Sequence, residues 1–142
     1  MVQAYNFLAS WQLFPEKGAY EKGDRPKSGI YKIEAVEGKK ELRIFHNWLS
    51  LENQAFASNY TILADGDLHP LPESEGADKV QALFPDGITF EIHFYRGGQT
   101  ILHVVHEIMP NGYLRVTQQG ELENGQAYTN MEYYHKQMSV LP

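Results

Sequence analysis

The sequence predicts an all-β protein built as one antiparallel up-and-down β-barrel of about eight to ten strands. Turn signals recur at even spacing along the second half of the chain. The segments between these turns are rich in aromatic and β-branched residues, and helix signals are poor throughout. The 142 residues suffice for one domain but not for two ordinary ones, so a single barrel domain is expected over 1–142.

The second half reads as an antiparallel meander, because hairpin loops join only antiparallel neighbours. Asn-Gly and Asp-Gly favour the positive backbone angles of tight hairpin turns. The turn signals are Asp86-Gly87, Gly97-Gly98, Asn111-Gly112 and Asn124-Gly125. The strands expected beside them span 88–95, 100–109, 113–120 and 126–135.

The first half continues this pattern less regularly, with an apolar opening strand around Trp11, a long loop over 15–29 and a turn at 37–39. Further strands are expected over 28–35, 40–48, 55–63 and 79–84, with an acidic loop over 73–78. Several runs are longer than the usual strand of about five or six residues. Long strands in a meander favour a closed barrel, because closure removes unpaired edges; a sandwich is the alternative.

Period-two alternation assigns an inner, mainly apolar face to several strands, because successive side chains point to opposite sides of a sheet. Two of these inner faces carry a histidine. The final strand stays ambiguous, since both of its faces carry tyrosine. The expected inner sets include Leu42, Ile44, His46 and Trp48; Ile88, Phe90, Ile92 and Phe94; and Leu102, Val104, His106 and Ile108.

Composition excludes several classes of partner and site. A net charge of −6 argues against a broad nucleic-acid interface, which needs clustered Lys and Arg. The absence of cysteine excludes disulfides and thiolate metal sites. Without a cationic leader or a stretch of roughly 20 apolar residues, we expect a cytoplasmic protein that does not enter a membrane. A monomer or homodimer is expected, with the apolar tail 138–142 as the candidate dimer contact.

An aromatic-rich interior with a few polar groups is typical of a pocket for a small apolar or aromatic ligand. The same composition fits a filled β core, in which a buried histidine is satisfied by a tyrosine hydroxyl or water. Both interpretations stay open. The residues expected to bind the ligand are His46, Trp48, Phe90, Phe94 and His106.

No residue is assigned a catalytic role, and neither a cofactor nor a metal is expected, because no motif of the common enzyme classes is present. His103 and His106 have a metal-ligand spacing only on a helix; on a strand they point to opposite sides. The strand carboxylates Glu107 and Glu132 are expected to point outward. Binding is therefore favoured. The alternatives are an isomerase or dehydratase with His46 or His106 as general base, and a solid barrel that contacts a protein partner.

Six segments carry a resemblance that runs in order along nearly the whole chain. They are Ser10-Trp11-Gln12-Leu13-Phe14-Pro15-Glu16-Lys17, Pro26-Lys27-Ser28 with Tyr31-Lys32-Ile33, Asp65-Gly66-Asp67-Leu68-His69-Pro70-Leu71, Ala77-Asp78-Lys79-Val80, Gly125-Gln126-Ala127-Tyr128-Thr129-Asn130 and Tyr134-His135-Lys136-Gln137. Together they resemble a family of bacterial lipocalin-like, or calycin-type, β-barrel domains of uncharacterised function.

The resemblance implies a barrel of the lipocalin or fatty-acid-binding type with an apolar ligand, and it implies no established activity. Haem-binding barrels of similar size open on Gly-x-Trp-x-Gly-x-Gly, whereas 9–15 here contain no glycine, which argues against haem. The resemblance also implies a structural seal at one end of the barrel, in which the Lys136 cation lies over the Trp11 indole. A pocket is then expected toward the other end.

Overall fold

The computed structural model describes residues 5–36, 41–71 and 76–137. Two 3₁₀ turns, η1 (Tyr5–Phe7) and η2 (Pro15–Lys17), flank the first strand, and no α-helix occurs in these three ranges. The strands are β1 (Ala9–Leu13), β2 (Ala19–Tyr20), β3 (Ser28–Ala35), β4 (Glu41–Leu49), β5 (Ala55–Leu63), β6 (Leu68–Pro70), β7 (Lys79–Asp86), β8 (Thr89–Arg96), β9 (Gln99–Ile108), β10 (Leu114–Glu121) and β11 (Ala127–Lys136).

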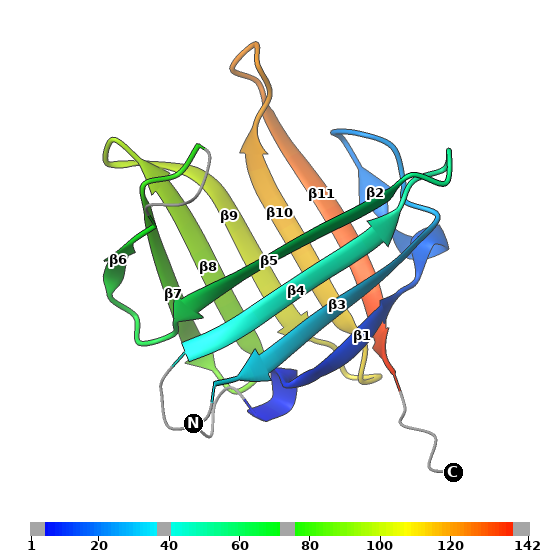
Figure 1. Ribbon diagram of the computed structural model, residues 1–142, viewed down its shortest axis with the longest axis horizontal. Helices are drawn as coiled ribbons and strands as arrows, with labels where there is room; N and C mark the ends of the chain where they lie inside the picture. Colours follow the sequence, from blue (N-terminus) through cyan, green and yellow to red (C-terminus); the bar gives the residue numbers. More distant parts are fainter. Residues whose placement is uncertain (1–4, 37–40, 72–75, 138–142) are drawn as a thin grey trace.

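Ten of these strands form one antiparallel sheet that curls into a nearly closed barrel (Figure 1). Their order is β5-β4-β3-β1-β11-β10-β9-β8-β7-β6, so most neighbours in space are also neighbours along the chain. β1 pairs with both β3 and β11 and thereby joins the first strand to the last. β2 lies off this path and pairs with β11. The predicted all-β, up-and-down barrel is confirmed.

One part of the barrel interior is filled by aromatic and aliphatic side chains. The ring of Phe7, in η1, lies 5.8 Å from that of Phe84 and 5.9 Å from that of Phe90. Phe84 and Phe90 stack on each other at 4.5 Å. Each large apolar side chain buried in this way stabilises the fold by roughly 1.5–3 kcal/mol. The largest fully buried side chains are Trp11, Tyr134, Phe7, Phe90, Ile33, Leu42, Ile44, Ile92, Leu114 and His106.

Trp11 and Lys136 meet at this filled end. They are directly opposite each other in the pairing of β1 with β11. The buried indole donates its Nε1–H to the backbone carbonyl of Phe7 at 3.1 Å. The Lys136 ammonium lies 5.5 Å from the centroid of the Trp11 ring, within the range of a cation–π contact. That this seal stabilises the barrel stays a prediction.

β5 is an edge strand of the sheet, and its first part is exposed. This strand pairs with β4 on one side, and residues 55–59 are all exposed. Even Phe56, which lies opposite Trp48 on the inner face, is 38% exposed. Figure 1 shows β5 crossing in front of the strands β8 to β11.

Two local expectations need correction. Ile88 was expected in the core, but it is 56% exposed, because the turn at Asp86 and Gly87 extends to it. The Asp86 carboxylate accepts a hydrogen bond from the Ile88 amide at 3.0 Å, and β8 begins at the next residue. The segment 15–29 was expected to be a loop, but it contains η2 and β2.

Three expected features lie outside the described residues: the turn at 37–39, the acidic residues 73–75 and the tail 138–142. Within the described ranges, no helix has the length and apolar character needed to cross a membrane.

Candidate functional site

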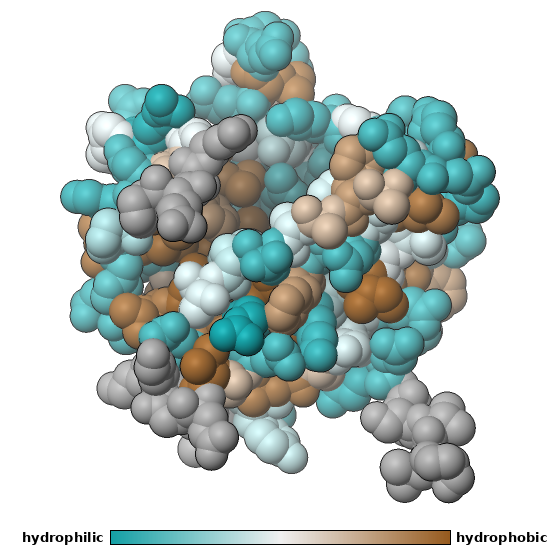
Figure 2. All heavy atoms as spheres, in the orientation of Figure 1, coloured by the Kyte–Doolittle hydropathy of each residue, from teal (hydrophilic) through white to brown (hydrophobic). Residues whose placement is uncertain are grey.

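A pocket of about 240 Å³ lies in the barrel, and neither Trp11 nor Lys136 lines it. Its walls come from β4, β10 and β11 and from the segment that includes β2. Figure 2 shows the face that carries β5 as a mosaic of hydrophilic and hydrophobic residues with a recess above that strand. The lining residues are Tyr20, Lys22, Asp24, Pro26, His46, Trp48, Val116, Gln118, Asn130 and Glu132. The lining is therefore mainly polar and aromatic.

Glu132 points into this pocket, so the expected outward orientation was wrong for this residue. It lies opposite Val116, which is buried, and directly paired residues share one face of a sheet. Its Oε2 accepts a hydrogen bond from the Tyr20 hydroxyl at 2.6 Å, and its Oε1 accepts one from Tyr134 at 2.9 Å. No ion pair joins Glu132 to another of the described residues.

The two tyrosines beside Glu132 keep their protons at neutral pH. Burial raises the pKa of Tyr20, and the charge and hydrogen bond of Glu132 raise it further. The same two causes, burial first, raise the pKa of Tyr134. Both hydroxyls therefore donate to the carboxylate.

β2 places Tyr20 at the pocket and is held there by β11. Tyr20 lies opposite Asn130, whose Oδ1 accepts hydrogen bonds from the backbone amides of Glu21 and Lys22 at 2.8 and 3.0 Å. The Asn130 amide donates in turn to the Lys22 carbonyl at 3.0 Å. The Lys22 ammonium lies 5.1 Å from the centroid of the Tyr128 ring. These hydrogen bonds hold the segment after β2 at the pocket, and the Lys22 ammonium contacts the aromatic ring of Tyr128.

His46 and Trp48, two of the five predicted ligand residues, form an aromatic wall of the pocket. Their ring centroids are 4.6 Å apart, and Trp48 also stacks on Phe56 at 5.2 Å. Burial lowers the pKa of His46, and the charge of Glu132 opposes this shift. The imidazole is therefore neutral at pH 7. It makes no hydrogen bond to another described residue, so it offers the pocket one donor and one acceptor.

The other three predicted ligand residues do not line the pocket. His106 and Phe90 are fully buried, with ring centroids 4.9 Å apart. Tyr31 donates its hydroxyl proton to Nε2 of His106 at 2.8 Å, while Nδ1 donates to the Phe90 carbonyl at 3.0 Å. Burial lowers the pKa of His106 to about 4, and the bond to Phe90 opposes the shift. Phe94 packs against the core. A ligand contact for these three stays a prediction.

Tyr31 lies between the two histidines that the sequence placed on inner faces. Its ring centroid is 5.3 Å from that of His46 and 5.5 Å from that of His106. Burial raises its pKa, and the neighbouring Tyr60 adds to the rise. The two imidazoles are therefore separated by a neutral phenol, and only His46 reaches the pocket.

Several polar residues lie on the outer face of the barrel, away from this pocket. Glu107 forms an ion pair with Arg115 at 2.9 Å, in the outward orientation predicted for it. His103 points away from buried His106, so these two share no site. In the described part of the chain, the group of side chains able to hold a metal is Glu91, His93 and His103.

No protein-family model matches the chain, and a search of curated proteins finds no match. Any functional conclusion therefore rests on the residues and geometry of the pocket itself.

Proposed function

We propose that this protein is a lipocalin-like binding protein whose pocket takes a small aromatic molecule with a positively charged amino group. The observation that carries the proposal is Glu132. Its carboxylate faces the pocket with hydrogen bonds from Tyr20 and Tyr134, and it forms no ion pair with another of the described residues, although Lys22 also lines the pocket. In a partly desolvated site, a carboxylate attracts a cation more strongly than it does in bulk water.

The wall of His46 and Trp48 supports an aromatic ligand. A planar ring that packs on these side chains gains about 0.5–1.5 kcal/mol beyond its area burial. The ring of Trp48 also offers an electron-rich face to a ligand cation. Gln118 and neutral His46 supply donors and acceptors for a further polar group.

The size of the pocket supports a small ligand. Its 240 Å³ lies below the range of about 300–1,000 Å³ that is usual for drug-sized ligands. At about 30 Å³ of liquid volume per water molecule, it holds on the order of eight waters, or a ligand of roughly ten non-hydrogen atoms. A single ring with a short amino side chain fits this volume.

Three phenols of similar size and different charge test the proposal: tyramine, p-cresol and 4-hydroxyphenylacetate. Binding is measured by two-dimensional NMR of the full chain, because chemical shifts report both affinity and location. We expect tyramine to bind most tightly, p-cresol more weakly and the anion least, with shifts centred on Trp48 and Asn130. Equal affinity for the three probes would contradict the amine assignment, and shifts elsewhere would contradict the site.

Glu132→Gln is the diagnostic variant, because it removes the charge and keeps the shape. A hydrogen bond to a charged group contributes about 1.5–3 kcal/mol, so tyramine affinity should fall about 10–100-fold while p-cresol affinity stays the same. Glu107→Gln is the matched control, since this carboxylate lies on a strand but faces outward beside Arg115. It should leave all three affinities unchanged.

A second candidate function is supported by the state of His46. A neutral imidazole that faces the pocket beside a carboxylate can act as the general base of an isomerase or dehydratase. His106 has both ring nitrogens engaged, so this candidate rests on His46 alone. Deuterium exchange at the α-carbon of a small aromatic ketone tests it. Exchange that is equally fast with the wild type and His46→Gln would exclude this role.

A further inference from the structure

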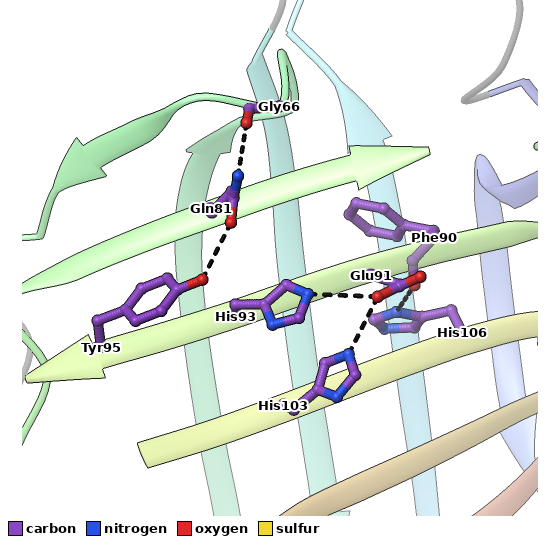
Figure 3. A network of polar contacts seen from close by, with 8 residues as sticks. All are labelled: Gly66, Gln81, Phe90, Glu91, His93, Tyr95, His103 and His106. Carbon is purple, nitrogen blue, oxygen red and sulfur yellow. Dashed lines mark hydrogen bonds and ion pairs between the residues drawn. The ribbon is translucent and has the colours of Figure 1, made fainter. Parts of the chain in front are cut away.

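Two histidines and a carboxylate converge on the outer face of β8 and β9 (Figure 3). Nε2 of His93 lies 3.2 Å from Oε1 of Glu91, and Nε2 of His103 lies 3.1 Å from the same oxygen. The side chains are 22–28% exposed, so the cluster is partly desolvated yet open to solvent. We propose that Glu91, His93 and His103 bind a divalent first-row transition-metal ion, with Zn²⁺ as the probe.

The fold brings the two histidines together through a β-bulge. Beside the Gly97-Gly98 turn, Tyr95 lies opposite Thr100. The next residue of β8, Phe94, lies opposite Leu102 rather than Ile101, so the register has shifted by one residue. This shift places His93 directly opposite His103, and the two rings stack at 4.1 Å. Glu91 is two residues from His93 along β8 and therefore shares its face. All three side chains thus project from paired strands rather than from a loop.

The spacing of the ligand atoms suits a small ion. The three candidate ligand atoms lie within 4.8 Å of one another. Ligand atoms about 2.0–2.2 Å from a tetrahedral Zn²⁺ are about 3.3–3.6 Å apart, so the two N–O separations here are only a few tenths of an ångström shorter. Side-chain rotations that separate each nitrogen slightly from Oε1, and bring the two nitrogens to a similar spacing, would admit an ion. Three protein ligands leave a fourth position for water.

The donor set matches this class of ion. Imidazole nitrogen is a favoured ligand of zinc, copper and nickel, and the Glu91 carboxylate adds an oxygen and a negative charge. Because a carboxylate only accepts hydrogen bonds, each Nε2 carries its proton in the structure described. In each neutral ring, metal binding transfers that proton to Nδ1 and turns the Nε2 lone pair to the ion.

A chain of contacts from β7 leads to the ring beside His93. His93 stacks on Tyr95 at 6.2 Å with 17° between the ring planes. The Tyr95 hydroxyl donates to Oε1 of Gln81 at 3.0 Å, and the amide of Gln81 donates to the Gly66 carbonyl at 2.7 Å (Figure 3). These hydrogen bonds hold the Tyr95 ring beside that of His93.

Isothermal titration of ZnCl₂ into the tag-free full chain, stripped with a chelator, tests the proposal. The variants are His93→Ala, His103→Ala and Glu91→Gln. The matched control is His69→Ala, because His69 also contacts a carboxylate, that of Asp65 at 2.8 Å, but without a second histidine. Thermal melts of all proteins verify that the outer-face variants fold.

We expect one Zn²⁺ to bind in the wild type and in His69→Ala. Because even indirect partners of a metal contribute about 10–100-fold in affinity, each ligand variant should bind at least about tenfold more weakly. Co²⁺ gives a second measurement, since its visible absorption spectrum reports tetrahedral nitrogen and oxygen ligands. Three results would overturn the proposal: no binding by the folded wild type, wild-type affinity in both histidine variants, or loss of binding in His69→Ala. The tyramine titration probes the pocket at Glu132 rather than this cluster, so its outcome does not depend on any of these three results.

Discussion

Replacing His106 with glutamine should remove much of the acid sensitivity of this fold. In the folded protein, burial holds the pKa of His106 at about 4, whereas the value in an unfolded chain is near 6.5. Between these values the unfolded chain binds a proton at this site and the folded protein does not. Stability therefore rises with pH through this window, and it is lost as the pH falls.

The size of the effect follows from the pKa difference. A shift of one pKa unit corresponds to 1.36 kcal/mol, so the full depression amounts to about 3 kcal/mol. With these two pKa values, about 2 kcal/mol is lost between pH 7 and pH 5, and most of the remainder by pH 4. This is a large share of the roughly 5–15 kcal/mol that stabilises a domain.

Urea denaturation followed by tryptophan fluorescence measures the effect from pH 4 to pH 8. At pH 7, His106→Gln should be less stable than the wild type, because its amide fits the bonds to Tyr31 and Phe90 less well. This deficit should shrink by about 2 kcal/mol at pH 5, since glutamine does not titrate. Other titrating groups, His46 included, are common to both proteins and cancel in the difference. A stability difference that is independent of pH would refute the reasoning.

Three further substitutions test the packing by the same denaturation measurement. Trp11→Ala should cost about 3–5 kcal/mol, because the indole is fully buried, and an unchanged stability would contradict its role in the seal. Lys136→Ala should cost at most about 1 kcal/mol, as expected for an exposed cation–π contact, and a larger loss would point to a different role for the lysine. Tyr31→Phe should cost about 1–3 kcal/mol because it leaves Nε2 of His106 without a donor. Tyr5→Phe is its control, since Tyr5 is 75% exposed, and it should change stability by less than about 0.5 kcal/mol.

Local patterns were sufficient to predict the strands and most of their inner faces. The alternation around Ile44, Phe90 and Val104 assigned these residues to the core, where they are buried. Two residues of the candidate pocket, His46 and Trp48, followed from the same alternation. These predictions depend only on the two-residue period of a strand, which is a property of the local backbone.

The orientation of Glu132 depended on the register of one hairpin. A two-residue turn at Asn124-Gly125 would place Val116 opposite Tyr133 and turn Glu132 outward. In the structure, the Leu122 amide bonds to the Gln126 carbonyl, so the loop contains three residues and Val116 lies opposite Glu132. One extra residue in the loop exchanges the two faces of the strand. The amino-acid composition of the hairpin does not reveal this extra loop residue.

The sequence by itself determined an all-β barrel, its long strands and its aromatic interior, because turn residues and alternation act over a few neighbours. Only the tertiary structure decided which polar groups meet. It brought Tyr20 to Glu132, across 112 positions of the chain, through the two-residue strand β2. It also set His93 opposite His103 through a bulge. Such meetings depend on register and closure, which are set by packing of the whole barrel rather than by any single segment.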